Sequence, residues 1–214
     1  LRSLVSGATS GVGSYGGSCI DVLIRNLDED EAAHGIADYE LYYSAGTVTD
    51  KYSPGDTLTP GSTYAAIENL VAEGVGGSVR TEIDHMVSVG MTWPGQIYVH
   101  ATDATTEQLA RMADEGTAIA WSPRSNLDLY GETTTADVAH RMGVPIMLGP
   151  DWTWSGSLNP AREMACANDY LRSRDSDIND VQIWRWTTSD AARVLELDGV
   201  IGSLDVGMLA DIAV

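Results

Sequence analysis

Along this 214-residue chain, short apolar runs alternate with longer amphipathic stretches. The short runs are rich in Val, Ile, Leu and Tyr and are bounded by Gly, Pro or polar residues, which is typical of β-strands. They are nearly apolar throughout, as expected of strands that are covered on both faces. We therefore expect strands at Asp21–Leu27, Tyr39–Ser44, Tyr64–Val71, Gln96–Ala101, Thr117–Ser122 and Pro145–Gly149.

The amphipathic stretches between and after these runs have the spacing of helices. The first three stop directly before Gly90, Gly116 and Gly143, and glycine is the usual residue just past a helix C-terminus. The predicted helices are Val79–Val89, Thr105–Glu115, Thr134–Met142, Asn159–Arg172, Asp180–Trp186 and Ser189–Leu197.

This alternation of strand and helix predicts an α/β fold with parallel strands. An open doubly wound sheet and a closed (β/α)8 barrel both fit it, and both place functional residues at the carboxyl ends of the strands. The Pro- and Gly-containing stretch Tyr52–Ser62 is expected to be a loop. The segment Gly199–Val214 is expected to form a turn, a loop around Gly207 and a final strand entered at Ala210.

The charge of the chain argues against polyanionic partners. Its formal net charge is −19, and Lys51 is its single lysine. A protein that neutralises phosphates needs clustered Lys and Arg, so neither nucleic acid nor an anionic membrane is expected as a partner. Cys19 and Cys166 match no metal or disulfide spacing, which favours buried thiols in a reducing compartment such as the cytoplasm.

Three ionisable residues follow predicted strands and are candidates for chemistry. His100 ends one strand, Asp151 follows another, and Glu73 follows a third. An imidazole and two carboxylates could bind a metal or move protons. Each also has a structural alternative: a satisfied core histidine, a helix-capping aspartate and a solvated loop glutamate.

Other motifs carry weaker signals. Ser122–Asn126 is expected to be a polar loop suited to holding substrate, with Ser125 and Asn126 near its mouth. Trp152 and Trp154 could line a pocket for a planar substrate, or could supply packing in a chain that has no Phe. Gly11–Gly16 matches GxGxxG, but the residues after it do not predict a helix, so a dinucleotide site is not expected.

Several segments resemble the amidohydrolase superfamily, especially its cytosine-deaminase and chlorohydrolase-like branch. Leu4–Ser10 resembles its "sGvTtv" strand, and Val99–Ala101 resembles its strand-6 histidine segment. Three further matches are Trp121–Leu127 to the "CPrSN" loop, Leu148–Asp151 to the "lGtD" strand-8 aspartate, and Gly202–Ile212 to the closing "GsLepGklADiv" segment. The matches span nearly the whole chain in the expected order.

The resemblance implies an incomplete (β/α)8 barrel of the TIM type over residues 1–198, with residues 199–214 returning a strand to a small β-sandwich. It implies a divalent metal ion, zinc or iron, that lowers the pKa of bound water toward ~7 for attack on an amide, amidine or ring carbon. Asp151 would bind the metal and accept the water's proton, His100 would be a second ligand or orient the water, and Glu73 would shuttle a proton.

The chain departs from the family pattern at two metal motifs. It contains no HxH, so it is expected to begin after strand 1 of the barrel. Leu70 stands where the strand-5 histidine is expected, with Asn69 beside it as a weak substitute ligand.

Two functions fit the sequence. The chain could be the larger part of a hydrolase that acts on a small-molecule C–N bond. It could also be a degenerate binding or scaffold subunit without metal. A barrel without one strand exposes two sheet edges, so we expect a missing N-terminal segment, a partner chain or a homo-oligomer to cover them.

Overall fold

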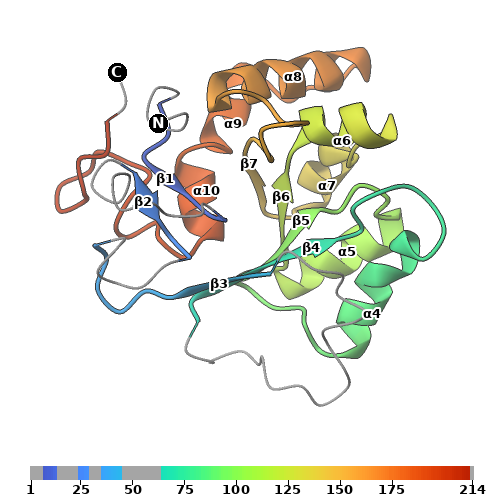
Figure 1. The fold of residues 1–214 in the computed structure, drawn as a ribbon, viewed down its shortest axis with the longest axis horizontal. Coiled ribbons are helices and arrows are strands. Elements are labelled where there is room, and N and C mark those ends of the chain that lie inside the picture. The colour runs from blue at the N-terminus through green and yellow to red at the C-terminus, as the bar shows by residue number, and fades with distance from the viewer. Residues whose placement is uncertain (1–6, 14–23, 29–34, 45–63, 213–214) are drawn as a thin grey trace.

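The computed structural model describes residues 7–13, 24–28, 35–44 and 64–212, which form two parallel sheets and the helices around them. The larger sheet runs in the order β3-β4-β5-β6-β7, and every neighbouring pair is parallel (Figure 1). Strands adjacent in this sheet are also consecutive in the chain. The described sheet therefore lacks the reversal of strand order that a doubly wound sheet has at its switch point. Its strands are β3 (Leu41–Ser44), β4 (Ala66–Val71), β5 (Gln96–His100), β6 (Ala118–Trp121) and β7 (Ile146–Leu148).

The helices follow the strands in the order that the sequence predicts. Gly116 and Gly143 end α5 and α7 with φ of 76° and 89°, a left-handed conformation in which glycine has no Cβ to clash. Asn159 caps α8 by accepting from the Arg162 N–H. The helices are η1 (Val79–Thr81), α4 (Glu82–Ser88), α5 (Thr106–Glu115), α6 (Pro123–Tyr130), α7 (Ala136–Met142), α8 (Pro160–Ser173), α9 (Asp180–Arg185) and α10 (Ser189–Val194).

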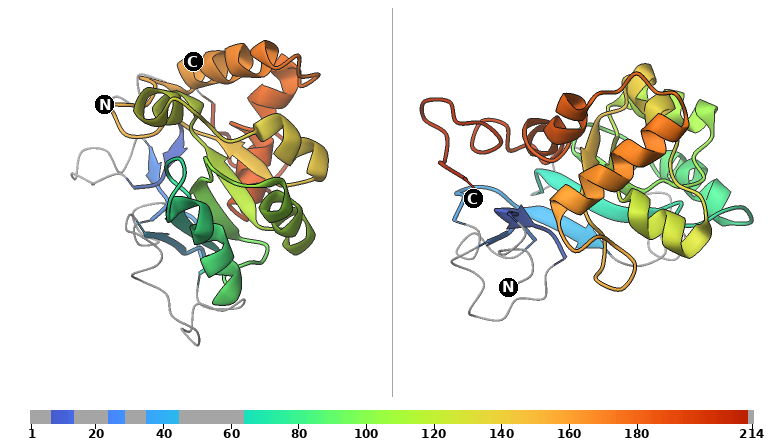
Figure 2. Two further views of the ribbon diagram at one scale, coloured as in Figure 1. Left: turned by 90° about the vertical axis from the view of Figure 1, so that its right-hand side faces the viewer. Right: turned by 90° about the horizontal axis from the view of Figure 1, so that it is seen from above.

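The alternation of side chains along the strands divides the core between the two faces of the sheet. On one face, Ile67, Tyr98 and Ile119 belong to a cluster that includes buried residues of α4, α5, α7, α8 and α9. On the other face, Ile97 and Ala118 belong to a cluster with residues of α10 and the segment after it. Figures 1 and 2 show α4, α5 and α7 on one side of the sheet, with β1, β2 and the C-terminal segment on the other.

The smaller sheet pairs β1 (Ser10–Gly11) with β2 (Arg25–Asn26). Gly13, at a φ of 71°, leaves room for the Tyr43 ring, which would lie 3.2 Å from a Cβ at this position. Gly13, the second glycine of the GxGxxG match, is therefore needed for close packing against Tyr43 of β3. Arg25 forms an ion pair with Asp211, which fastens the C-terminal segment to β2.

Most predicted elements are confirmed, and two are wrong. The predicted loop Ser122–Asn126 is the start of α6, because Pro123 occupies the first helical turn, where its missing N–H costs nothing. No strand is entered at Ala210 within the described residues, which end at position 212 in irregular structure. The prediction for Tyr52–Ser62 lies outside the described residues. Of the predicted strand Asp21–Leu27, residues 21–23 lie outside them, and the described part contains β2.

Among the described residues, no helix is long and apolar enough to cross a bilayer.

Candidate functional site

Three of the predicted residues converge at the carboxyl ends of the strands. Glu73 follows β4, His100 ends β5 and Asp151 follows β7. His100 Nε2 lies 3.6 Å from Glu73 Oε1 and 4.0 Å from Asp151 Oδ2. One ligand atom of each residue lies within 4.8 Å of the other two. We call these three residues the rim cluster.

The backbone at the ends of β4 and β5 has an uncommon conformation that orients Glu73 and His100. Ala72, His100 and Ala101 have φ values of 53°, 77° and 47°, in the left-handed region that non-glycine residues rarely adopt. Hydrogen bonds hold this course: Ala101 N–H donates to Val71 O at 3.0 Å, and Thr134 Oγ1 donates to the His100 carbonyl. Such strain costs about 1–3 kcal/mol per residue and is concentrated at functional sites.

A chain of buried hydrogen bonds fixes the His100 ring. Trp121 Nε1 donates to Thr133 Oγ1 at 2.8 Å, and Thr133 Oγ1 donates to Asn126 Oδ1 at 3.1 Å. The Asn126 amide nitrogen lies 2.9 Å from His100 Nδ1. Because the amide donates, Nδ1 accepts, and the Nε2 of the neutral ring carries the proton and faces the two carboxylates.

Asp151 is held by the loop that it begins and by α6. Its Oδ2 accepts from Ser125 Oγ, and its Oδ1 accepts from the Trp152 N–H at 2.6 Å. Ser125 Oγ also lies 2.9 Å from Ser155 Oγ. The loop folds back so tightly that a Cβ on Gly156 would lie 2.5 Å from the Asp151 carbonyl oxygen. Gly156 is therefore required for the position of Asp151.

Glu73 is held by Tyr130, whose hydroxyl donates to Glu73 Oε1 at 3.0 Å. Burial raises the pKa of Tyr130 to about 12, and the hydrogen bond to Glu73 adds to this effect. The tyrosine therefore stays protonated as a donor at neutral pH. It comes from the last turn of α6, so one helix positions all three members of the rim cluster through Ser125, Asn126 and Tyr130.

The other predicted site residues are placed differently. Ser125 and Asn126 are fully buried behind Asp151 and His100, not at an open mouth. Trp152 and Trp154 are 71% and 84% exposed in the loop after Asp151. Asn69 pairs with Tyr98 in the sheet register and lies on the same face of β4 as Ile67 and Val71, which is the face that packs against the helices. A ligand role for Asn69 stays a prediction.

Sequence reasoning missed the positioning residues Tyr130, Thr133 and Thr134. A signal for Tyr130 exists, because it lies four residues after Asn126, and such residues share one face of a helix. The prediction of a loop at Ser122–Asn126 hides this signal. The two threonines follow α6 and carry no signal that separates them from other loop residues.

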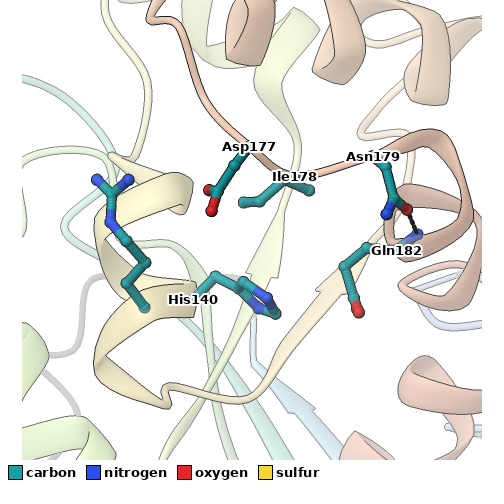
Figure 3. A pocket seen from close by; sticks show the side chains of 6 residues that line it. His140, Asp177, Ile178, Asn179 and Gln182 are labelled. Carbon is teal, nitrogen blue, oxygen red and sulfur yellow. Dashed lines mark hydrogen bonds between the residues drawn. The ribbon is translucent and has the colours of Figure 1, made fainter.

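Outside the rim cluster, the described residues form a larger and a smaller pocket. The larger, of about 310 Å³, is lined by His140, Arg141, Asp177, Ile178, Asn179 and Gln182, and we call it the α7–α9 pocket. Its side chains come from α7, α9 and the connection before α9 (Figure 3). Because α7 ends just before β7 begins, this pocket lies toward the amino end of β7, opposite the end that carries Asp151. The smaller pocket, of about 230 Å³, borders Ser155.

Comparison with known proteins places this geometry in a family. A profile of the amidohydrolase family matches residues 55–214. A 5-methylthioadenosine/S-adenosylhomocysteine deaminase from Teredinibacter turnerae is 27% identical over 137 residues, which cover 62% of this chain and 31% of the relative. An 8-oxoguanine deaminase from Pseudomonas aeruginosa is 30% identical over 135 residues, which cover 61% of this chain and 30% of the relative.

The match is therefore to about a third of the length of these relatives. The crystal structure of an adenosine deaminase from Xanthomonas campestris with bound zinc has a TM-score of 0.59 and 22% identity, over 68% of this chain and 36% of that one. This likeness shows a shared fold. Since the family profile covers well over half of the residues, the chain belongs to the amidohydrolase family.

Proposed function

We propose that this chain carries the catalytic rim of a metal-dependent hydrolase that breaks C–N bonds in small molecules, with ring amino groups as the favoured target. The observation that carries the proposal is the convergence of Glu73, His100 and Asp151 from three separate strand ends. Family membership and the two deaminase relatives support the same reaction class.

The donor set of the rim cluster suits a divalent cation. Ligands at about 2.1 Å in tetrahedral geometry lie roughly 3.4 Å apart, close to the 3.6 and 4.0 Å separations around His100 Nε2. Asp151 and His100 would hold the ion, with Glu73 within reach. A bound zinc or iron would lower the pKa of a water molecule and polarise the substrate. Asn69, as a third ligand, remains part of the proposal.

Ligation by His100 Nε2 requires the ring proton on Nδ1. The Asn126 amide would then present its oxygen to Nδ1, and its nitrogen would donate to Thr133 Oγ1. This hydroxyl can accept, because its oxygen has two lone pairs and receives one hydrogen bond from Trp121. The same buried network thus supports both tautomers of the ring.

The side chains of the rim cluster divide the proton transfers. Asp151 takes the proton of the attacking water at a carboxylate oxygen, and the Ser125 hydroxyl and the Trp152 N–H hold that carboxylate in place. Asp151 then passes this proton to the leaving amine, and Glu73, whose Oε1 is fixed by Tyr130, shuttles the second proton of the water to the ring nitrogen. Trp152 and Trp154 would cover one face of a planar substrate.

For the whole architecture, we propose an incomplete (β/α)8 barrel. The sequential order of five parallel strands supports a barrel arc, with β1 and β2 as further strands of it. Residues 1–198 would form the barrel portion, and residues 199–214 would belong to a small β-sandwich. A preceding segment, a partner chain or a second copy would complete the edges and supply further ligands, and the protein would work in the cytoplasm.

The test combines metal content with ammonia release. The purified protein should bind one zinc or iron per chain and release ammonia from at least one compound in a panel of aminopurines and aminopyrimidines. Both properties should be lost in Asp151→Ala. A protein that binds no metal at saturating zinc and releases no ammonia would instead be the degenerate scaffold, which the intact rim cluster disfavours.

A further inference from the structure

The pocket that borders Ser155 has an unusual electrostatic character for this chain. Its lining includes Arg124 and Asp128 of α6, Trp154 and Leu158 of the loop after β7, and Arg162 of α8. We call it the arginine pocket. Two guanidinium groups stand at a small hollow in a protein of net charge −19.

Arg124 and Arg162 differ from the other described arginines in their ion pairing. Within the described part of the chain, eight arginines pair with a carboxylate: Arg25, Arg80, Arg111, Arg141, Arg172, Arg174, Arg185 and Arg193. Arg124 and Arg162 are the described arginines without such a pair, although the chain has 31 acidic residues. Both line the same pocket. A cation left unpaired amid an excess of acids is available to a ligand.

The arginine pocket lies beside the rim cluster. Ser155 is part of its lining, and the Ser155 hydroxyl is 2.9 Å from that of Ser125, which donates to Asp151. Arg124 and Arg162 lie in the first turns of α6 and α8, whose N-terminal dipole ends favour anions. The nearest backbone N–H of α6 is already used, because Arg124 N–H donates to Glu163. Recognition would therefore depend on the two guanidinium groups.

We propose that the arginine pocket binds a carboxylate or phosphate group carried by the substrate whose C–N bond is broken at the rim cluster. The proposal rests on the proposed function, because only a hydrolase at the rim cluster makes the bound anion part of a substrate. Guanidinium forks suit the oxygens of either anion. Asp128 lies in the same lining and opposes anion binding, so its charge limits the affinity. Trp154 provides an exposed ring on which the planar part of the substrate can lie.

Binding can be measured without turnover. Inorganic phosphate and acetate are titrated separately into the metal-free full chain at constant ionic strength. The readout is the Trp154 indole N–H signal in two-dimensional NMR, assigned with Trp154→Phe. We expect saturable binding of at least one anion in the millimolar range. The stronger of the two identifies the group, and Arg124→Ala and Arg162→Ala should each weaken it at least fivefold.

Two variants serve as matched controls. Arg172→Ala removes the same charge from an exposed site on the same helix as Arg162, and should change the affinity less than twofold. Asp128→Asn should tighten binding several-fold. Equal losses in Arg162→Ala and Arg172→Ala, or no saturable shift with either anion, would overturn the proposal.

Substrate recognition is tested separately in the metal-loaded protein. Among compounds that release ammonia, those with an anionic group should lose at least tenfold in kcat/KM in Arg162→Ala, and neutral analogues should change less than twofold. Equal effects on both would contradict the substrate role. Anion binding without any ammonia release would overturn the proposed function and leave the pocket as a separate anion site.

Discussion

The rim cluster and the α7–α9 pocket contain similar residue types but differ in what those residues do. Each has a histidine and at least one carboxylate group, and the α7–α9 pocket is the larger of the two hollows described above. In the rim cluster, His100 is 1% exposed, one ring nitrogen is held by Asn126, and the other faces two carboxylates. In the α7–α9 pocket, the His140 ring packs edge-on against Trp186, with centroids 5.5 Å apart.

The polar groups of the α7–α9 pocket are largely committed to their neighbours. Arg141 pairs with Asp137, Asn179 caps α9, and Gln182 donates to Asp190. Within the described residues, the rim cluster is the group of three acidic, histidine or cysteine side chains that could hold a metal. Convergence and orientation therefore distinguish a candidate site better than volume or residue type.

The largest effect is expected from Asp151→Asn. This change keeps the shape of the side chain but removes its capacity to accept a proton, so kcat for ammonia release should fall about 10³-fold, within the usual range for a general base. His140→Asn is the matched change in the other pocket and should leave kcat within twofold. Similar losses in both variants would remove the distinction between the two regions.

Asn126 tests whether the orientation of His100 matters. Asn126→Ala frees Nδ1 and should weaken zinc affinity 10–100-fold, as expected when the partner of a metal-binding histidine is lost. Asn126→Asp accepts from Nδ1–H and should retain the affinity. Isothermal titration with zinc measures both variants. An unchanged affinity in Asn126→Ala would show that His100 is not a metal ligand.

Glu68 shows what burial does to a carboxyl group that belongs to neither region. It is 4% exposed on β4, and burial, followed by repulsion from Asp28, raises its pKa to about 8. Between pH 4.5 and 8 the folded state holds a proton that the unfolded state has released, so stability falls as pH rises, by at most about 1.4 kcal/mol per pH unit.

Glu68→Gln should remove this slope. Urea unfolding at pH 5.5 and 7.5 should show a smaller loss of unfolding free energy in the variant than in the unmodified protein. The same slope in both proteins would mean that Glu68 ionises normally. Burial, followed by the charge of Glu68, raises the pKa of Tyr39 and of Tyr43, so both tyrosines are kept in the test.

The smallest effect is expected from His140→Ala. Losing the ring contact with Trp186 should lower the free energy of unfolding by about 1 kcal/mol, typical of an aromatic pair. Zinc affinity should stay unchanged. A loss of zinc binding without a loss of stability would assign chemistry to the α7–α9 pocket.

Sequence patterns predict the strands and helices well because β3, β4, β5 and β6 are buried on both faces and several helices end at a glycine. They also predict the three rim residues, since parallel strands bring their carboxyl ends to one edge. The pattern fails at α6, where a proline followed by polar residues looks like a loop although Pro123 begins a helix.

Other features depend on tertiary contacts that no local pattern contains. The left-handed conformation of His100 and Ala101 is imposed by hydrogen bonds to Val71 and Thr134. Arg124 and Arg162 look like ordinary helix residues until the pairing of the other arginines is known. The pairing of Asp211 with Arg25 likewise joins segments far apart in the sequence.

The central claim is that His100 and Asp151 share one cation at the carboxyl ends of the strands. Zinc titration of the unmodified chain, His100→Ala, Asp151→Ala and His140→Ala, followed by metal analysis after dialysis, tests it directly. The account predicts one zinc per chain in the unmodified protein and His140→Ala, and less than a tenth of that in the other two. Equal zinc content in all four proteins would contradict it.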